Sequence, residues 1–164
     1  MTQQRAYDDA LTTRIGQTAM LLHGGDREEA RQRFGVLWTE IGETGAALHR
    51  CTLARYLADA QDDPGDTLAW DLRALAAADT GLADRSEPAG RALRVLYPSL
   101  HLDLAADYLR LHHPEAARLH LDRARRALGV LGDDGYARGV RTAVERLARR
   151  LERNGEGPES WPGS

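Results

Sequence analysis

Residues 104–124 read LAADYLRLHHPEAARLHLDRA. On both sides of the central HHP, apolar residues recur every three or four positions, which is the spacing of one face of an α-helix. Small residues, Ala105 and Ala117, stand where two helices would have to approach closely, and Tyr108 and Leu121 stand where they would fill the seam. The stretch therefore predicts two antiparallel helices packed against each other and joined by a short turn.

The rest of the chain shows the same helical spacing, and alternating strand patterns are absent. We therefore predict an all-α fold of about seven helices, stacked as three antiparallel hairpins with a C-terminal capping helix. Residues 1–153 are expected to form one domain and residues 154–164 a disordered tail. The expected helices cover about 5–23, a segment that begins after Asp26, and about 43–61, 64–80, 88–112, 114–131 and 134–153.

Several helix starts and buried faces can be predicted in detail. Asp26 with Glu29 three residues later suggests a capping box, and Asp63 before Pro64 suggests an N-cap. Pro98 predicts either a kink or the start of a new helix, because proline lacks the N–H that a helix hydrogen bond needs. The buried stripes are expected to hold Leu68, Leu72 and Leu75 in the fourth helix, and Tyr136, Val140, Val144, Leu147 and Leu151 in the seventh.

The stretch that opens this section resembles a tetratricopeptide repeat. Leu104, Ala105 and Tyr108 match the large, small and aromatic positions of that repeat's first helix, and the second helix is matched by Ala117, Leu121 and Ala124. His101 replaces the expected tryptophan, and Gly129 stands where the repeat-ending proline would be. A fainter unit surrounds GGDREEA with Ala30 and Phe34, and another the segment from Leu53 to Leu72. The resemblance implies a helical-hairpin superhelix.

The resemblance also implies a binding site. In this family the first helix of each hairpin lines a concave groove that holds segments of other proteins. Carried onto the well-matched unit, the groove residues are Leu102, Ala106, Leu109 and Arg110; from the fainter units we add Arg55 and Arg94. Trp70 joins this set because it falls off the leucine stripe beside Arg73, and an exposed tryptophan next to arginine suits a binding surface.

Composition points to a cytoplasmic protein. No apolar run approaches the ~20 residues that cross a bilayer, and the polar MTQQRAYDDAL lacks the apolar core of a signal peptide. The single cysteine, Cys51, fits a reducing compartment. All 22 basic residues are arginine, which suggests a GC-rich bacterial source. The net charge of −3 argues against a dedicated nucleic-acid binder of high pI.

We expect neither a metal nor a cofactor. His112 and His113 fall in a turn and His120 is seven positions from His113, so these histidines do not have the spacing of metal ligands and are expected at the surface. The run DDPGD at 62–66 superficially matches the DDxxD pattern of terpene synthases, but Pro64 and Gly65 make it a helix entrance. No catalytic motif is present.

Arginine is dense near the end of the chain. Glu145 lies four residues from both Arg141 and Arg149, a spacing that predicts helix-surface ion pairs. A solvated face is therefore the first interpretation. The alternative is an anionic partner, since several arginines on one surface would attract such a ligand.

These observations predict a non-catalytic module or adaptor that binds another protein or an acidic peptide. One alternative is a small helical enzyme or ligand-binding protein with a pocket near His101, Asp103 and Tyr108. Another is a homodimer in which a second copy fills the groove or the open end of the stack. No membrane association is expected.

Overall fold

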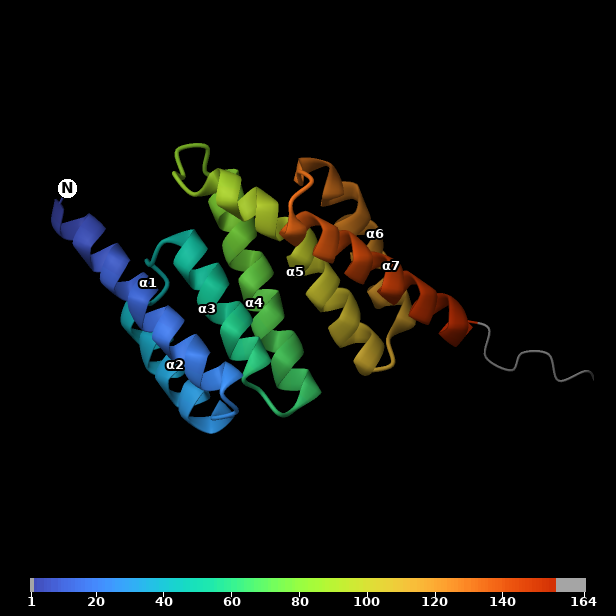
Figure 1. Ribbon diagram of the computed structural model, residues 1–164, viewed down its shortest axis with the longest axis horizontal. Coiled ribbons are helices and arrows are strands. Elements are labelled where there is room, and N and C mark those ends of the chain that lie inside the picture. The colour runs from blue at the N-terminus through green and yellow to red at the C-terminus, as the bar shows by residue number, and fades with distance from the viewer. Residues whose placement is uncertain (1, 156–164) are drawn as a thin grey trace, which may run out of the picture. The chain divides into compact units, whose positions relative to one another are not determined.

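A computed structural model describes residues 2–155, and within them every regular element is a helix (Figure 1). The all-α class and the seven helices are confirmed. Residues 156–164, most of the predicted disordered tail, lie outside the described residues, whereas Asn154 and Gly155 belong to the last helix. The α-helices are α1 Thr2–His23, α2 Arg27–Ile41, α3 Ala47–Asp59, α4 Pro64–Ala83, α5 Gly90–Arg110, α6 Pro114–Ala127 and α7 Gly135–Gly155, with a 3-10 turn η1 at Leu128–Val130.

The contacts divide the chain into two compact units. The first runs from Met1 to Leu93 and the second from Arg94 to Ser164, so that α5 begins in the first unit and continues in the second. The single domain over 1–153 stays a prediction beside this division. By sequence, the first unit carries 10 arginines and 15 acidic residues, and the second carries 12 and 10. Negative charge is therefore concentrated in the first unit.

The core of the first unit joins α1, α2 and α3. Leu11 and Ile15 from α1 meet Phe34 from α2 and Leu53 from α3, and all four are at most 5% exposed. The ring of Phe34 stacks on Tyr56, with centroids 5.2 Å apart and planes 4° apart. Apolar residues at helical spacing on three helices thus bury one common seam.

Helices α3 and α4 lie side by side (Figure 1). The buried face of α4 consists mostly of small side chains. The prediction that α4 buries its leucine stripe is wrong, because Leu72 is 40% exposed and Leu68 and Leu75 are only half-buried. Small side chains let the two helix backbones approach closely, and the larger side chains are displaced to the flanks. The buried positions of α4 are Thr67, Asp71, Ala74, Ala77, Ala78 and Gly81.

Gly81 lies at a point of close packing between α4 and its neighbours. A Cβ atom at this position would lie 2.7 Å from the Cβ of Ala47 and 2.5 Å from a methyl group of Leu93. Distances below about 3.4 Å are inside ordinary carbon–carbon contact. Glycine is therefore required here for space.

The starts of α4 and α2 differ. The Asp63 side chain accepts a hydrogen bond of 2.9 Å from the N–H of Gly65, and Pro64 is the first helical residue, as the sequence predicts. Asp26 is the N-cap of α2, but its side chain makes no capping bond. The predicted capping box is therefore wrong: Glu29 instead accepts a hydrogen bond of 2.7 Å from Nε of Arg33.

Helix α5 continues through Pro98, so the alternative of a new helix starting there is wrong. Pro98 is among the most fully buried side chains in the described part of the chain. Apolar packing of its ring offsets the helix hydrogen bond that proline cannot donate.

In the second unit, α5, α6 and α7 share one core. Ala105 and Ala117 are 0% exposed, Leu121 is 3% exposed, and Tyr108 packs against them half-buried, which confirms the predicted helix seam. Helix α7 buries the expected stripe with one exception. Tyr136 is 44% exposed, and Ala137 takes the buried position instead. The α7 residues in the core are Ala137, Val140, Val144, Leu147, Ala148 and Leu151.

The predicted ion pairs of Glu145 do not form. Within the described residues, neither Arg141 nor Arg149 lies within ion-pair distance of a carboxylate. Arg141 instead donates hydrogen bonds of 2.8 Å and 3.3 Å to the carbonyls of Gly132 and Leu131. This arginine therefore holds the loop that leads into α7.

Two helix ends have the same turn. After α1, the N–H of Asp26 bonds to the carbonyl of Leu21 and Gly25 has a φ of 92°. After α5, the N–H of His113 bonds to the carbonyl of Tyr108, and here His112 has a φ of 63°. These bonds define Schellman motifs, in which one residue adopts the left-handed conformation.

Candidate functional site

The predicted groove residues of the second unit lie on α5 at different depths. Leu102 and Ala106 are half-buried and pack against the core. Leu109 is 7% exposed and belongs to the core, so it supports this face from beneath and offers it little surface. Arg110 ends α5 with an exposed side chain, and Arg94 is exposed as well.

In the first unit, Arg55 lies half-buried on α3. Burial raises the pKa of the Asp59 carboxyl. The charge of Arg55 and, to a smaller extent, that of His23 lower this pKa and so partly offset the effect of burial. Arg55 thus balances a carboxylate of its own helix.

Trp70, the other predicted residue in this unit, pairs with a second tryptophan. Its ring meets Trp38 of α2 edge-on, with centroids 5.2 Å apart and planes 89° apart. Both side chains are half-buried, and both pack on the core of the first unit. Edge-to-face geometry is one of the arrangements that aromatic rings prefer. The pair therefore joins α2 to α4 and leaves part of two large rings at the surface.

An arginine lies over each ring of this pair. The guanidinium carbon of Arg73 is 4.2 Å from the ring centroid of Trp70, and that of Arg50 is 5.6 Å from Trp38. Both distances are within the range of cation–π attraction. We call Trp38, Arg50, Trp70 and Arg73 the tryptophan–arginine cluster; it is assembled from α2, α3 and α4.

The packing of α3 on α4 explains this position. Because α4 turns its small side chains toward α3, Trp70 lies at the edge of the interface, and Arg73, one turn later, can reach over it. The sequence indicates the neighbouring Trp70 and Arg73. Trp38, like Trp70, is expected from its amphipathic helix to lie in the core or line a groove, but its pairing with Trp70 and the position of Arg50 were not predicted, because nothing local in the sequence shows which helices lie next to α4.

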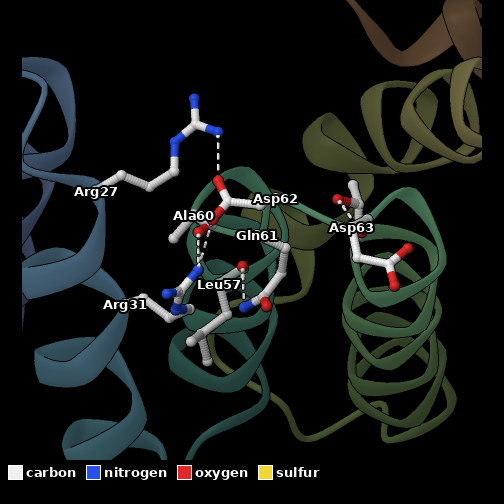
Figure 2. A network of polar contacts seen from close by, with 8 residues as sticks. Arg27, Arg31, Leu57, Ala60, Gln61, Asp62 and Asp63 are labelled. Atoms are coloured by element: carbon white, nitrogen blue, oxygen red, sulfur yellow. Dashed lines mark hydrogen bonds and ion pairs between the residues drawn. The ribbon is translucent and has the colours of Figure 1, made fainter.

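Other arginines in the same unit have structural partners. Arg27 and Arg31 both bind the carboxylate of Asp62, at 3.1 Å and 3.3 Å, and Arg31 also donates to the carbonyl of Ala60 (Figure 2). Hydrogen bonds from Arg27 and then Arg31 lower the pKa of Asp62. This network ties α2 to the loop between α3 and α4, so its charges are used within the fold.

A hollow of about 350 Å³ lies between α1 and α2 and is lined by both polar and apolar groups. Its charged residues are also paired: both terminal nitrogens of Arg14 donate to Glu40 at 2.9 Å, and Arg33 binds Glu29. The hydrogen bond from Arg14 lowers the pKa of Glu40. Internal pairing leaves this hollow less able to recognise a charged ligand than the tryptophan–arginine cluster.

The second unit contains a pair of buried histidines. His101 and His120 are 2% and 7% exposed, and their Nδ1 atoms are 3.0 Å apart. A neutral imidazole carries one ring hydrogen, so one Nδ1 donates and the other accepts. Burial and, to a smaller extent, the charge of Arg123 lower the pKa of His120. The prediction of a surface position for His120 is therefore wrong, because α6 turns it toward α5.

Tyrosines enclose this pair. The ring of Tyr108 stacks on His120 with centroids 5.4 Å apart, and Tyr97 meets His101 edge-on at 4.7 Å. His101 and Tyr108 of the alternative pocket thus meet through His120, while Asp103 lies half-buried on the same helix. The arrangement places one histidine–histidine hydrogen bond inside the α5–α6 seam.

Among residues 2–155, no group of three or more histidine, cysteine, aspartate or glutamate side chains could hold a metal ion. None of the helices described here combines the length and the apolar character that a bilayer-spanning segment needs. Comparison with known proteins gives no match: no family model fits the chain, and no curated protein or solved structure matches it significantly.

Proposed function

We propose that this protein is a non-catalytic module that binds a segment of another protein and acts as an adaptor in the cytoplasm. The observation that carries the proposal is the tryptophan–arginine cluster, where two half-buried tryptophans and two arginines from three helices meet. Tryptophan and arginine dominate the residues that contribute most to protein–protein binding.

The physical reason is the combination of area and rigidity. A tryptophan ring offers a large apolar surface with few rotatable bonds, so little entropy is lost when a partner covers it. Trp38 and Trp70 also fix each other through their contact, and the arginines restrict them further. A partner would therefore meet a surface that is already ordered.

The α5 face in the second unit supports the same function with a different chemistry. Leu102 and Ala106 are half-buried, and Arg110 is exposed at the end of the helix. These side chains give an apolar strip that ends in a positive charge, which suits a peptide with apolar residues and an acidic end.

Selection from a random peptide display library against the full-length protein tests the proposal. We expect enriched peptides whose affinity, measured by fluorescence anisotropy, falls roughly tenfold or more in Trp70→Ala. Trp70→Phe should keep part of the affinity. Met20→Ala, a control at a 73% exposed residue of the same unit, should change little.

Two results would count against the proposal. Either no peptide is enriched, or the enriched peptides bind Trp70→Ala and Arg110→Ala as well as the unchanged protein while circular dichroism shows an intact fold. A second copy of this chain is another candidate occupant. Light scattering after size exclusion would detect it as a doubled mass at concentrations where no peptide is bound.

A further inference from the structure

We infer that the tryptophan–arginine cluster recognises a carboxylate flanked by apolar side chains, so that the partner is a segment with aspartate or glutamate next to leucine or an aromatic residue. This inference rests on the proposed function and specifies the chemistry of the same site. It is carried by a hydrogen-bond donor of the cluster that the described residues leave unsatisfied.

That donor is Nε of Arg50. It is buried, and no acceptor within the described residues reaches it. A buried donor without an acceptor is costly, and structures rarely retain one without a reason. The guanidinium carbon of Arg50 lies 5.6 Å from the ring centroid of Trp38. The N–H groups of a guanidinium point outward in its own plane, so an incoming acceptor would have to lie in that plane.

A carboxylate is the acceptor that best fits an arginine. Its two oxygens match the fork of N–H groups, and the opposite charges strengthen both hydrogen bonds. Arg73, an exposed residue, brings a second guanidinium over the other ring of the pair, that of Trp70. Within the described residues, no carboxylate lies within ion-pair distance of Arg50 or Arg73, whereas Arg14, Arg27, Arg31 and Arg33 of the same unit are all paired.

The rings decide what must flank the carboxylate. Trp38 and Trp70 present apolar surface between the two arginines, and covering it requires apolar side chains on the partner. Without them a partner would hold only ion pairs near the surface, which contribute little.

The charge of the unit argues against a polyanion. By sequence, residues 1–93 carry five more acidic residues than arginines, so a nucleic-acid backbone would meet repulsion along its length. A single carboxylate that contacts Arg50 directly is affected far less, because attraction at short range exceeds repulsion from distant, screened charges.

Titration with three synthetic peptides of equal length tests the inference. The first carries glutamate between phenylalanine and leucine, the second replaces glutamate by glutamine, and the third keeps glutamate and replaces both apolar residues by serine. Fluorescence of Trp38 and Trp70 reports binding in a Trp161→Phe background, which leaves these two as the only tryptophans. We expect the first peptide to bind at least tenfold more tightly than either of the others.

Variants show whether the carboxylate contacts the cluster. Arg50→Gln and Arg73→Gln should each weaken the first peptide severalfold, while Arg85→Gln, an exposed arginine of the α4–α5 connection, should not. Arg50→Gln should also cost the glutamine peptide much less than the glutamate peptide. Circular dichroism checks the fold. Arg73→Gln, at an exposed position, keeps the test valid if Arg50→Gln does not fold.

The outcomes separate this inference from the proposed function. If the glutamate and glutamine peptides bind equally well and Trp70→Ala still weakens binding, the inference that the cluster recognises a carboxylate is wrong. The proposed function as a peptide-binding module then still stands. Tighter binding of an RNA oligonucleotide than of the first peptide overturns it in favour of a polyanion. If no peptide binds here while peptides selected by display bind in the second unit, the partner site lies on α5 instead.

Discussion

The α1–α2 hairpin of the first unit and the α5–α6 hairpin of the second share one construction. Gly25 and His112 occupy the left-handed position of their turns and are 87 positions apart, as are Ala30 and Ala117, both 0% exposed. The N-cap residues that follow the turns, Asp26 and His113, have similar backbone angles, and neither side chain makes a capping bond.

The two hairpins differ in the residues that carry out equivalent tasks. One turn uses glycine at its left-handed position and the other uses histidine. The α1–α2 seam contains Phe34, whose ring also stacks on Tyr56 of α3. The α5–α6 seam contains Leu121 and the pair of histidines His101 and His120. The similarity lies in the backbone, and it is set by two helices that meet through small residues. The side chains at the turn need only tolerate the geometry.

The largest expected effect tests whether the two seams are equivalent. Phe34→Ala should lower the free energy of unfolding by about 3–5 kcal/mol and Leu121→Ala by about 2–5 kcal/mol, since both remove a buried side chain and leave a cavity. Urea unfolding measured by circular dichroism gives both values. Leu119→Ala, at a 49% exposed position of α6, is the control and should stay near zero. A small effect for only one of the pair would break the equivalence.

The next effect concerns the turns and has opposite signs in the two hairpins. His112→Gly should stabilise the protein by about 1 kcal/mol or more, because a residue with a Cβ is strained at positive φ. Gly25→Ala should destabilise it by about 1–2 kcal/mol for the same reason. Thermal unfolding of both variants measures the difference. If His112→Gly destabilises, contacts of the histidine outweigh the strain.

A smaller effect distinguishes helix starts that look alike in sequence. Asp63→Ala should cost about 1 kcal/mol, since it removes the capping bond to the N–H of Gly65. Asp26→Ala should cost less than about 0.5 kcal/mol, because its side chain caps nothing. Equal losses in urea unfolding would mean that the charge at the helix start, rather than the bond, is what stabilises.

The smallest effect is a loss of stability as the pH falls just below 6.5, which only the second hairpin should show; the Arg14–Glu40 pair of the first hairpin responds only below about pH 4.5. Because the pKa of His120 is lowered in the folded protein, the unfolded chain binds a proton first as the pH falls below 6.5. The contribution of His120 to the free energy of unfolding is therefore complete above about pH 6.5, and it declines as the pH falls toward the lowered pKa of His120 in the folded protein. His120→Gln should flatten the decline in urea midpoint, and His113→Gln, at an exposed histidine, should not.

The sequence predicts the buried residues of a helix best where the helix packs against the core through a single apolar face. The stripe of Val140, Val144 and Leu147 on α7 and the seam of Ala105 with Ala117 follow from local spacing alone, and both are confirmed. The expected pocket and groove residues on α5 and α3 stay predictions, because spacing shows which face a residue takes but not what would bind there.

Prediction fails where an interface is made by small residues. In α4 the alanines, not the leucines, face the interface with α3. Close approach of the two helices gives more van der Waals contact than burying Leu72 at a larger interhelix distance would. The same effect left Trp70 free to meet Trp38. Contacts between residues far apart in sequence carry no local signal, and the buried pair His101–His120 escaped prediction for this reason.

Cys51, 0% exposed in the α3 helix, gives this protein a built-in probe of its own motions. It is the only thiol of the chain, so a thiol-reactive dye can modify the protein at one position, and only when α3 separates from its neighbours. The modification rate in the native state would then measure how often this part of the first unit opens, without any engineered label.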